Sequence, residues 1–456
     1  MHAASVGGLA ERLRRAGNSW VRTTHQRTDM PQRISIISLG ARGDTQPYVA
    51  LGGALRQRGL DVHLVGSPRY ADLLSGTGVQ FSSVEPDIES LIASPDGQRW
   101  LAAGQGAVPF ARWMKRVVGP AVDQLLEETA AAVQESDCFV YSPFALPAAS
   151  FAERMGVPSV MASFMPAHPT RDFPAIGFHR SLGDIGNRLS LRLTEQAFWQ
   201  VFRKRVNAWR GKTLGLPPWP FTGPFKEARQ MSRPTLYCFS TSVLAVPHDW
   251  PKCAHVTGYW QLNPPTGWQP PGPLADFMEA DTAPIVYVGF GSMVSGAPEQ
   301  RYRLIRSALR KAGARGVFLG DPKKLESDDL VQVVPHVPHT WLFPRIAAAV
   351  HHGGASTVGA SLTAGIPTIV CPHFLDQPFW GARVHALGAG PRPLPARELT
   401  AHSLADAVSA ALGDASMRRT AAELGQQLRA ETGIHRACDI IESTLHQTSG
   451  RGTAAE

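Results

Sequence analysis

Short apolar runs alternate along this chain with longer segments in which apolar residues recur every three or four positions. The first unit reads as a strand at 34–39, a helix at 47–58 and a second strand at 61–65. Such alternation predicts parallel strands joined by crossover helices. Two later runs of the same strand type lie at 138–141 and 158–162. Together these segments predict one parallel sheet.

A second series of the same kind follows a proline-rich stretch at 263–273, whose composition favours an extended connector. Its predicted strands are 285–290, 316–319, 331–334, 347–350 and 368–371. The chain then continues as helix from about Ser403 to His446. The expected fold class is α/β, with two doubly wound Rossmann-like domains facing a cleft.

The predicted organisation divides the 456 residues at changes of composition. Residues 1–29 are Arg-rich and irregular, which favours a disordered extension or an over-called start site, because nothing there could bury a core. The other predicted segments are an N-terminal domain at 30–262, the linker at 263–273, a C-terminal domain at 274–425, a helix at 426–446 that could pack back on the N-terminal domain, and a polar tail at 447–456.

Composition narrows the functional classes. The formal charge of +8 is spread along the chain, and the densest basic clusters lack interleaved aromatics, which disfavours nucleic acid as a partner. Peripheral contact with a membrane surface stays open, and oligomeric state is not predicted. The five cysteines show neither disulfide nor metal spacing, and no run has the length of a bilayer span or a secretion signal. A cytoplasmic location is expected.

The most informative segment is His351-His352-Gly353-Gly354-Ala355-Ser356-Thr357, which joins a predicted strand to a predicted helix. Free N–H groups at a helix start carry partial positive charge, and glycines let a diphosphate approach the backbone. Gly354, Ser356 and Thr357 are therefore expected at the diphosphate. Because successive strand residues face opposite ways, His352 is expected to point at the ligand and His351 into the core.

Asp376 and Gln377 follow the next predicted strand. A carboxylate beside an amide can hydrogen-bond vicinal sugar hydroxyls, whereas the alternative interpretation is a solvated turn before Pro378. A diphosphate site followed by a sugar site indicates a nucleotide sugar.

Asp44 is the candidate general base, because it follows a strand end and a glycine turn and should project into the cleft. The alternative is an N-cap for the helix expected near Pro47, since aspartate is a favoured cap residue. The sequence leaves both roles open.

Four segments together resemble the GT-B glycosyltransferases, covering the chain from 31 to about 445. They are 334–344, 351–357, 372–383 and the N-terminal Gly40-Ala41-Arg42-Gly43-Asp44-Thr45-Gln46-Pro47. The likeness is greatest to sterol 3-beta-glucosyltransferases and to bacterial glycosyltransferases of glycopeptide and macrolide biosynthesis. It implies inverting transfer of a hexose, with glucose favoured, from a UDP- or dTDP-sugar to a hydroxyl of an apolar acceptor such as a sterol, polyketide, macrolide or terpenoid.

The resemblance also assigns further residues. Ser292 falls in a second phosphate loop, and His336 and Val337 fall in the segment that binds the base. The acceptor would lie in the N-terminal domain, against candidate wall residues Trp113, Phe164, Met165 and Phe173. For these aromatic and methionine positions, ordinary core packing is the competing interpretation.

No cofactor or metal is expected beyond the nucleotide sugar, because no Asp-x-Asp motif occurs. The helix dipole, His352 and hydroxyl groups would stabilise the leaving diphosphate instead. The chain departs from many relatives at three places: the 40–47 loop holds no histidine, His336 stands where plant relatives have a stacking tryptophan, and Ala360 stands where many have a ribose-binding glutamate.

Three other functions compete. A nicotinamide or flavin oxidoreductase would need Gly-x-Gly-x-x-Gly, and the first glycines are spaced Gly40-x-x-Gly43. A nucleotide-sugar epimerase would not need the aromatic-rich insertion at 164–225. A catalytically silent nucleotide-sugar binder or partner protein would not need both Asp44 and the Asp376–Gln377 pair.

Overall fold

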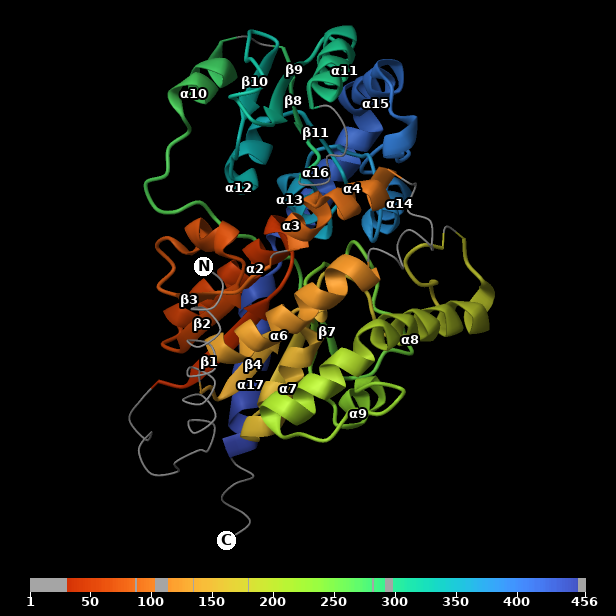
Figure 1. Ribbon diagram of the computed structural model, residues 1–456. Coiled ribbons are helices and arrows are strands. Elements are labelled where there is room, and N and C mark those ends of the chain that lie inside the picture. The colour runs from red at the N-terminus through yellow and green to blue at the C-terminus, as the bar shows by residue number, and fades with distance from the viewer. Residues whose placement is uncertain are drawn as a thin grey trace.

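The computed structural model describes residues 31–86, 88–102, 114–133, 135–178, 180–280, 283–291 and 298–449. Figure 1 shows two α/β bodies, one above the other, with the N-terminal half of the chain forming the lower body. The predicted extension at 1–29 lies outside the described residues. The last helix runs to Ser449, so the first residues of the predicted polar tail are helical.

The lower body is built on a seven-stranded parallel sheet in the order β3-β2-β1-β4-β5-β6-β7. The strands are β1 (Arg33–Ser38), β2 (Asp61–Gly66), β3 (Gln80–Ser83), β4 (Cys138–Tyr141), β5 (Ser159–Ser163), β6 (Thr235–Tyr237) and β7 (Ala254–Val256). Ile34 of β1 pairs with Val62 on one side and Cys138 on the other. The strand order therefore reverses between β1 and β4.

The upper body has a five-stranded parallel sheet in the order β10-β9-β8-β11-β12. Its strands are β8 (Ile285–Gly289), β9 (Arg315–Leu319), β10 (Val331–Val334), β11 (Ala348–His351) and β12 (Thr368–Val370). Here the order reverses between β8 and β11. Two doubly wound parallel sheets confirm the predicted α/β class, and ligands bind such sheets beyond the strand carboxyl ends at the reversal.

The helices cover these sheets and connect their strands (Figure 1). In the lower body they are α2 (Arg42–Gln57), α3 (Ile88–Ala93), α4 (Pro95–Ala102), α6 (Gly119–Ala132), α7 (Ala149–Met155), α8 (Gly183–Trp209) and α9 (Phe225–Gln230), with short turns η1 (Pro68–Leu74), η2 (Met114–Val118), η3 (Pro143–Ala148) and η4 (Arg210–Leu214). In the upper body they are α10 (Gly272–Glu279), α11 (Pro298–Lys311), α12 (His339–Leu342), α13 (Ala355–Ala364), α14 (Gln377–Ala386), α15 (Ala401–Gly413) and α16 (Ala415–Arg429), with η5 (Phe343–Arg345) and η6 (Ala396–Glu398).

The first helix begins five residues before the predicted start at Pro47, since α2 starts at Arg42. The prediction was wrong because proline was taken as a first-turn residue, whereas Pro47 lies inside the helix. Proline has no N–H to donate to the carbonyl four residues earlier. The Gly43 carbonyl therefore has no partner within the helix and accepts a hydrogen bond from Ser356 of the upper body.

The last part of the chain returns to the lower body. The predicted long helical stretch is broken, and its last piece is α17 (Gly433–Ser449), which packs on α2. Cys438, Ile441 and Leu445 of α17 are buried in the core that also holds β1 and β2. The predicted boundary at 425/426 falls inside α16, which continues to Arg429.

The chain passes between the two bodies twice, near Gly258 and near Gly433, and these two segments contact each other at the glycines. A Cβ atom on Gly433 would lie 2.9 Å from the backbone carbon of Gly258, and one on Gly258 would lie 2.7 Å from Glu431 Oε2. Only glycine allows the two segments to pass this closely.

All five cysteines are buried thiols without disulfides. Within the described ranges, no helix is both long and apolar enough to span a bilayer.

Candidate active site

A cleft of about 590 Å³ lies between the two bodies, at the carboxyl ends of the strands where each sheet reverses its order. It is lined from below by the loops after β1, β4 and β5, and from above by those after β8, β10, β11 and β12. Of the predicted site residues, those that line it are Asp44, Phe164, Met165, His336, Val337, His352, Gly354, Ser356, Thr357, Asp376 and Gln377.

Asp44 lies in the first turn of α2 and serves the helix as well as the cleft. Its Oδ2 accepts a hydrogen bond from the Ala41 N–H at 2.9 Å, which satisfies a backbone donor at the helix start. Asp44 is the third residue of the helix, and the N-cap position is occupied by Ala41. The predicted capping role is therefore performed from within the first turn. Burial raises the pKa of Asp44 to about 6, with a smaller contribution from the charge of Glu89. The other carboxylate oxygen is left to accept from a ligand.

The turn between β11 and α13 depends on its two glycines. Gly353 has a φ of +95°, and a Cβ there would lie 2.5 Å from Val370 Cγ1. A Cβ on Gly354 would lie 2.7 Å from His352 Nε2. Side chains are thus excluded from the start of α13, whose first N–H groups remain available to an anion.

The two neighbouring histidines take opposite sides of β11. His351 is fully buried, accepts a hydrogen bond from the Gly353 N–H at 3.1 Å and lies 3.3 Å from the Ser361 hydroxyl. His352 lines the cleft, and burial, together with the charge of His373, lowers its pKa to about 4. His352 is therefore neutral near pH 7, with one ring nitrogen as donor and the other as acceptor.

Ser356 joins the two bodies across the cleft. Its hydroxyl donates to the Gly43 carbonyl at 2.6 Å, the carbonyl that Pro47 leaves without an intrahelical partner. The predicted contact of the Ser356 side chain with diphosphate thus competes with an interdomain hydrogen bond. In the geometry seen, the backbone N–H groups at 355–357 are the part of this segment free to meet an anion.

Asp376 is half-buried and lines the cleft from the body opposite to that of Asp44. Burial raises its pKa to about 7, and the negative charge of Asp44 adds to the shift. Its Oδ2 accepts from the indole N–H of Trp380 at 3.0 Å, and this ring is fully buried. Trp380 therefore fixes the carboxylate that the sequence assigned to the sugar.

The side-chain oxygen of Gln377 is used within its own loop. This Oε1 atom accepts from the His373 N–H at 2.8 Å and from the Phe374 N–H at 3.2 Å, which holds the 373–377 loop together. Both lone pairs of this oxygen are engaged. The amide nitrogen is the end of the side chain that remains for a sugar hydroxyl.

The segment predicted to bind the base meets the N-terminal body through Arg42. The Arg42 Nη2 lies 3.0 Å from His336 Nε2 and 3.4 Å from Asp72 Oδ2. Burial and the nearby Arg42 charge lower the pKa of His336 to about 4, so the neutral ring accepts from the guanidinium. Val337 is buried in the upper core with only its edge at the cleft.

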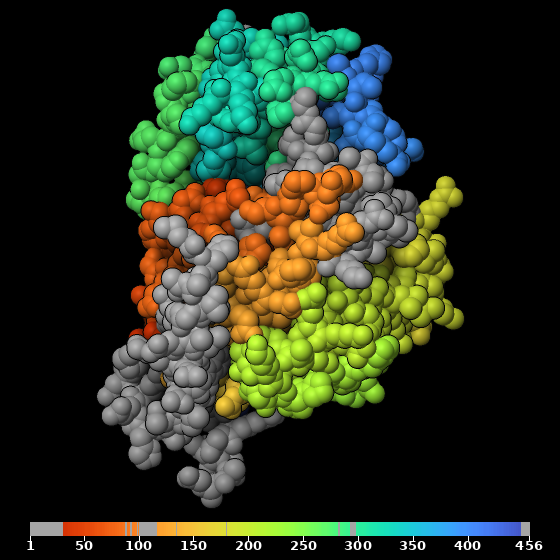
Figure 2. All heavy atoms as spheres, viewed as in Figure 1, coloured from red at the N-terminus to blue at the C-terminus, as the bar shows by residue number. Residues whose placement is uncertain are grey.

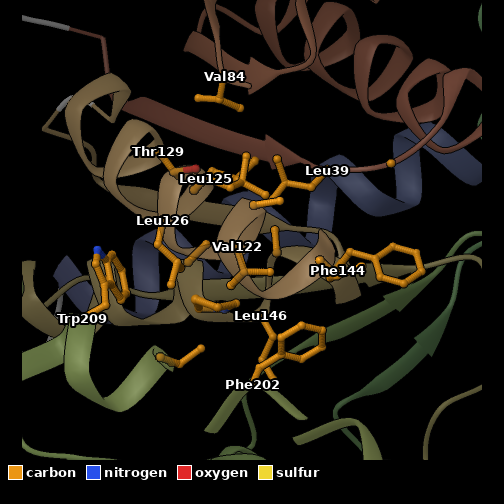
Figure 3. A pocket seen from close by; sticks show the side chains of 18 of the residues that line it. Leu39, Val84, Val122, Leu125, Leu126, Thr129, Phe144, Leu146, Phe202 and Trp209 are labelled. Atoms are coloured by element: carbon orange, nitrogen blue, oxygen red, sulfur yellow. The ribbon is translucent and has the colours of Figure 1, made fainter. Parts of the chain in front are cut away.

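Two largely apolar cavities adjoin the cleft inside the N-terminal body. The larger, of about 360 Å³, lies under the loop after β5 and is lined by Met165, Leu191 and Phe198 among others. Figure 3 shows the smaller, of about 140 Å³, where Leu39, Val122, Leu125 and Phe144 converge. Phe144 lines both cavities and the cleft, so it lies at the junction of these three spaces.

Phe173 is not among the residues that line the cleft. It packs between Trp250 and Phe379, at ring distances of 6.5 and 5.8 Å, as a partly buried side chain against the core. Its assignment to the acceptor wall stays a prediction, because an aromatic side chain in a long insertion can serve core and pocket equally well. Trp113 and Ser292 lie outside the described residues.

The sequence reasoning missed several lining residues. Phe144 follows the β4 strand, a position that could have been inferred from the strand-end rule. Arg42 was within the quoted loop but received no role. Leu375, with φ of +53° and an exposed side chain, borders both the cleft and the larger cavity. No local signal marks it. Among the described residues, no group of histidine, cysteine and carboxylate side chains is arranged to hold a metal ion.

Comparison with known proteins decides the family. The O-mycaminosyltylonolide 6-deoxyallosyltransferase of Streptomyces fradiae is 34% identical over 422 residues, covering 90% of this chain and 97% of that enzyme. The chain belongs to this glycosyltransferase family. The family model for the C-terminal domain of erythromycin biosynthesis protein CIII-like proteins matches residues 323–436, which include the segments 351–357 and 372–383.

Fungal relatives and solved structures agree with this assignment. The sterol 3-beta-glucosyltransferase of Cryptococcus neoformans var. neoformans serotype D is 36% identical over 444 residues, covering 91% of this chain but 27% of that protein. The chain thus spans about a quarter of such fungal relatives. The crystal structure of the kitacinnamycin glycotransferase superposes with a TM-score of 0.64 at 20% identity, covering 91% of this chain and 99% of that one. The GT-B fold of this glycosyltransferase is thereby established.

Proposed function

We propose that this glycosyltransferase transfers a hexose, with glucose favoured, from a UDP- or dTDP-sugar to a hydroxyl of an apolar acceptor, with inversion at the anomeric carbon. One observation supports this most directly. The half-buried Asp44 carboxylate and the glycine-lined start of α13 line the same cleft from opposite bodies, and apolar cavities adjoin this cleft within the body that holds Asp44. The arrangement suits a base on the acceptor side and an anion site on the donor side.

In the proposed reaction, the ionised Asp44 accepts the proton of the acceptor hydroxyl. The hydroxyl oxygen forms a bond to the anomeric carbon while the bond from that carbon to the diphosphate oxygen breaks. The electron pair of the broken bond leaves on the diphosphate. In-line attack opposite the leaving group inverts the configuration.

The charge that develops on the diphosphate would be met by groups of the C-terminal body. The first N–H groups of α13 and its dipole favour an anion at this place. The neutral His352 adds a hydrogen-bond donor. These groups supply the stabilisation that a divalent ion supplies in other transferases.

Recognition of the sugar would rest on Asp376 as acceptor and the Gln377 amide as donor. The acceptor would enter the larger cavity, where the Arg229–Glu195 ion pair at 2.7 Å supplies a polar group among apolar walls. An acceptor with an apolar frame and a second polar group remote from the reacting hydroxyl fits this lining. The names of the fungal sterol and bacterial macrolide relatives support the same class.

The proposal is tested by incubating the protein with labelled UDP-glucose or dTDP-glucose and a panel of sterols, macrolides, polyketides and terpenoids. Mass spectrometry is expected to detect an acceptor plus one hexose, with a β linkage by NMR. An epimerised donor without transfer would indicate an epimerase. Binding of the donor without any product across the panel would indicate a silent binder.

We expect kcat/KM to fall as the pH is lowered through about 6. The base must be ionised, and burial raises the pKa of Asp44 to about 6, so its protonation lowers activity as the pH falls through that value. Protonation of Asp376, whose pKa is raised to about 7, weakens sugar binding in the same direction. The measurement is kcat/KM between pH 4.5 and 8 in a buffer series of constant ionic strength. A profile that stays flat down to pH 5 would contradict the role of Asp44.

We also expect transfer to persist in excess EDTA, because backbone N–H groups and His352 are proposed to stabilise the diphosphate. Initial rates measured before and after chelation are expected to agree within about twofold, a difference below 0.5 kcal/mol. Loss of activity that added Mg²⁺ restores would contradict the metal-independent mechanism.

A further inference from the structure

One face of α8 exposes a row of large apolar side chains. Leu182, Ile185, Leu189 and Leu193 are 46%, 83%, 51% and 59% exposed, and Phe178 in the preceding loop is 51% exposed. The four leucine and isoleucine positions are spaced by three, four and four residues, which places them on a single helix face. These five residues are called the apolar stripe below.

The two halves of α8 differ in the kind of side chain that they bury. In its C-terminal half, Trp199, Val206 and Trp209 are buried against the body. In its N-terminal half, the buried residues are Asn187, Ser190 and Leu191. Here polar side chains face inward and large apolar ones face water, the reverse of a helix that only closes a core.

Basic residues flank the stripe. Arg171, Arg180 and Arg192 are exposed and Arg188 is half-buried, against the carboxylates of Asp172, Asp184 and Asp249. Asp249 accepts hydrogen bonds from the Thr170 hydroxyl and the Arg171 N–H, and the four arginines leave a net positive charge. Glu195, on the inner side, is already paired with Arg229. The charge beside the stripe therefore complements an anionic surface.

The opposite face of the same helix borders the larger apolar cavity. Leu191, Thr194 and Phe198 line that cavity, as does Ile176 just before Phe178. The stripe and the cavity are thus separated by the thickness of one helix, about 10 Å. Figure 2 shows the yellow segment that holds the start of α8 projecting from the edge of the N-terminal body.

We propose that the apolar stripe docks α8 on the surface of a lipid bilayer with anionic headgroups. A convex single row on a projecting helix, with arginines beside it, can insert among lipid headgroups. The arginines beside it contact lipid phosphates. Docking brings the cavity mouth to the bilayer, where apolar molecules concentrate. The surface is independent of the catalytic residues, so it stands or falls separately from the proposed transfer reaction.

The test is vesicle flotation of the full-length protein at low salt. Wild-type protein is expected to float with phosphatidylcholine vesicles that contain phosphatidylglycerol and only weakly with pure phosphatidylcholine. The double substitution Ile185→Asp, Leu189→Asp is expected to lower the partition coefficient by on the order of tenfold or more. Arg192→Gln is expected to lower it about fivefold on the anionic vesicles and to leave pure phosphatidylcholine binding unchanged.

Met231→Asp is the matched control, because Met231 is 60% exposed but lies after α9, outside the stripe. It is expected to float like wild type, and thermal melts of all variants are expected to coincide. Failure of wild-type protein to float, or equal flotation of the double variant, would overturn the proposal. A wild-type dimer in sedimentation that the double variant dissociates, without vesicle binding, would show instead that the stripe is a contact between copies.

Discussion

Replacing Asp44 by asparagine is expected to lower kcat by about 100- to 10,000-fold, the usual contribution of a positioned base. Asparagine keeps the shape of the side chain, and its carbonyl oxygen can still accept from the Ala41 N–H, so the start of α2 should be retained. What is lost is the group that takes a proton. Affinity for UDP or dTDP, measured by calorimetry, is expected to remain within about twofold, below 0.5 kcal/mol.

The matched control is Asp172→Asn, an exposed carboxylate of the same body that lies outside the cleft lining. It is expected to leave kcat unchanged. The pKa of Asp376 is raised partly by the charge of Asp44, so the Asp44→Asn variant should also lower the pKa of Asp376. Near-wild-type turnover in Asp44→Asn would mean that Asp44 serves only as the helix cap and that the base lies elsewhere.

Replacing Asp376 by alanine is expected to lower kcat/KM by about 100- to 10,000-fold. The estimate applies above pH 7, where Asp376 is ionised, and follows from two sugar hydroxyls that each lose a hydrogen bond to the carboxylate, at about 1.5–3 kcal/mol apiece. The loss is expected to fall on the sugar and not on the nucleotide, because Asp376 follows β12, whereas the base-binding segment proposed at 336–337 follows β10 at the opposite edge of the sheet. Initial rates with varied donor concentration measure it.

The discriminating control compares two ligands on the same variant. Asp376→Ala is expected to weaken binding of the nucleotide sugar while binding of free UDP or dTDP stays within about twofold, less than 0.5 kcal/mol. Equal weakening of both ligands would mean that the substitution has displaced α14 rather than removed a sugar contact. Trp380→Phe is a milder companion, since it removes only the hydrogen bond that orients the carboxylate.

The sequence predicted the parallel sheets well because buried parallel strands appear as short continuous apolar runs. It also located the turn at 351–357, since only glycine fits where Gly353 and Gly354 lie. It separated His352 from His351 by simple strand alternation, and the structure places the two on opposite faces of β11.

The local sequence pattern did not decide the position of a residue where that residue type suits two different environments. Phe173 could belong to a pocket or to the core, and only its contacts with Trp250 and Phe379 show that it packs against the core. Pro47 could start a helix or lie within one, and the structure extends α2 back to Arg42. The sequence likewise did not show that the apolar stripe on α8 is exposed, because apolar residues at this spacing usually face the core.

The amino-acid sequence by itself determined the two-domain α/β fold, the glycosyltransferase resemblance and most of the cleft residues, because strand periodicity and glycine turns are encoded within a few neighbouring positions. Only the tertiary structure decided how those residues are used. The Ser356 hydroxyl donates to the Gly43 carbonyl across 313 positions of sequence, and the charge of Asp44 reaches Asp376 from the other domain. Such contacts depend on how two separately folded sheets face one another, which no local pattern records.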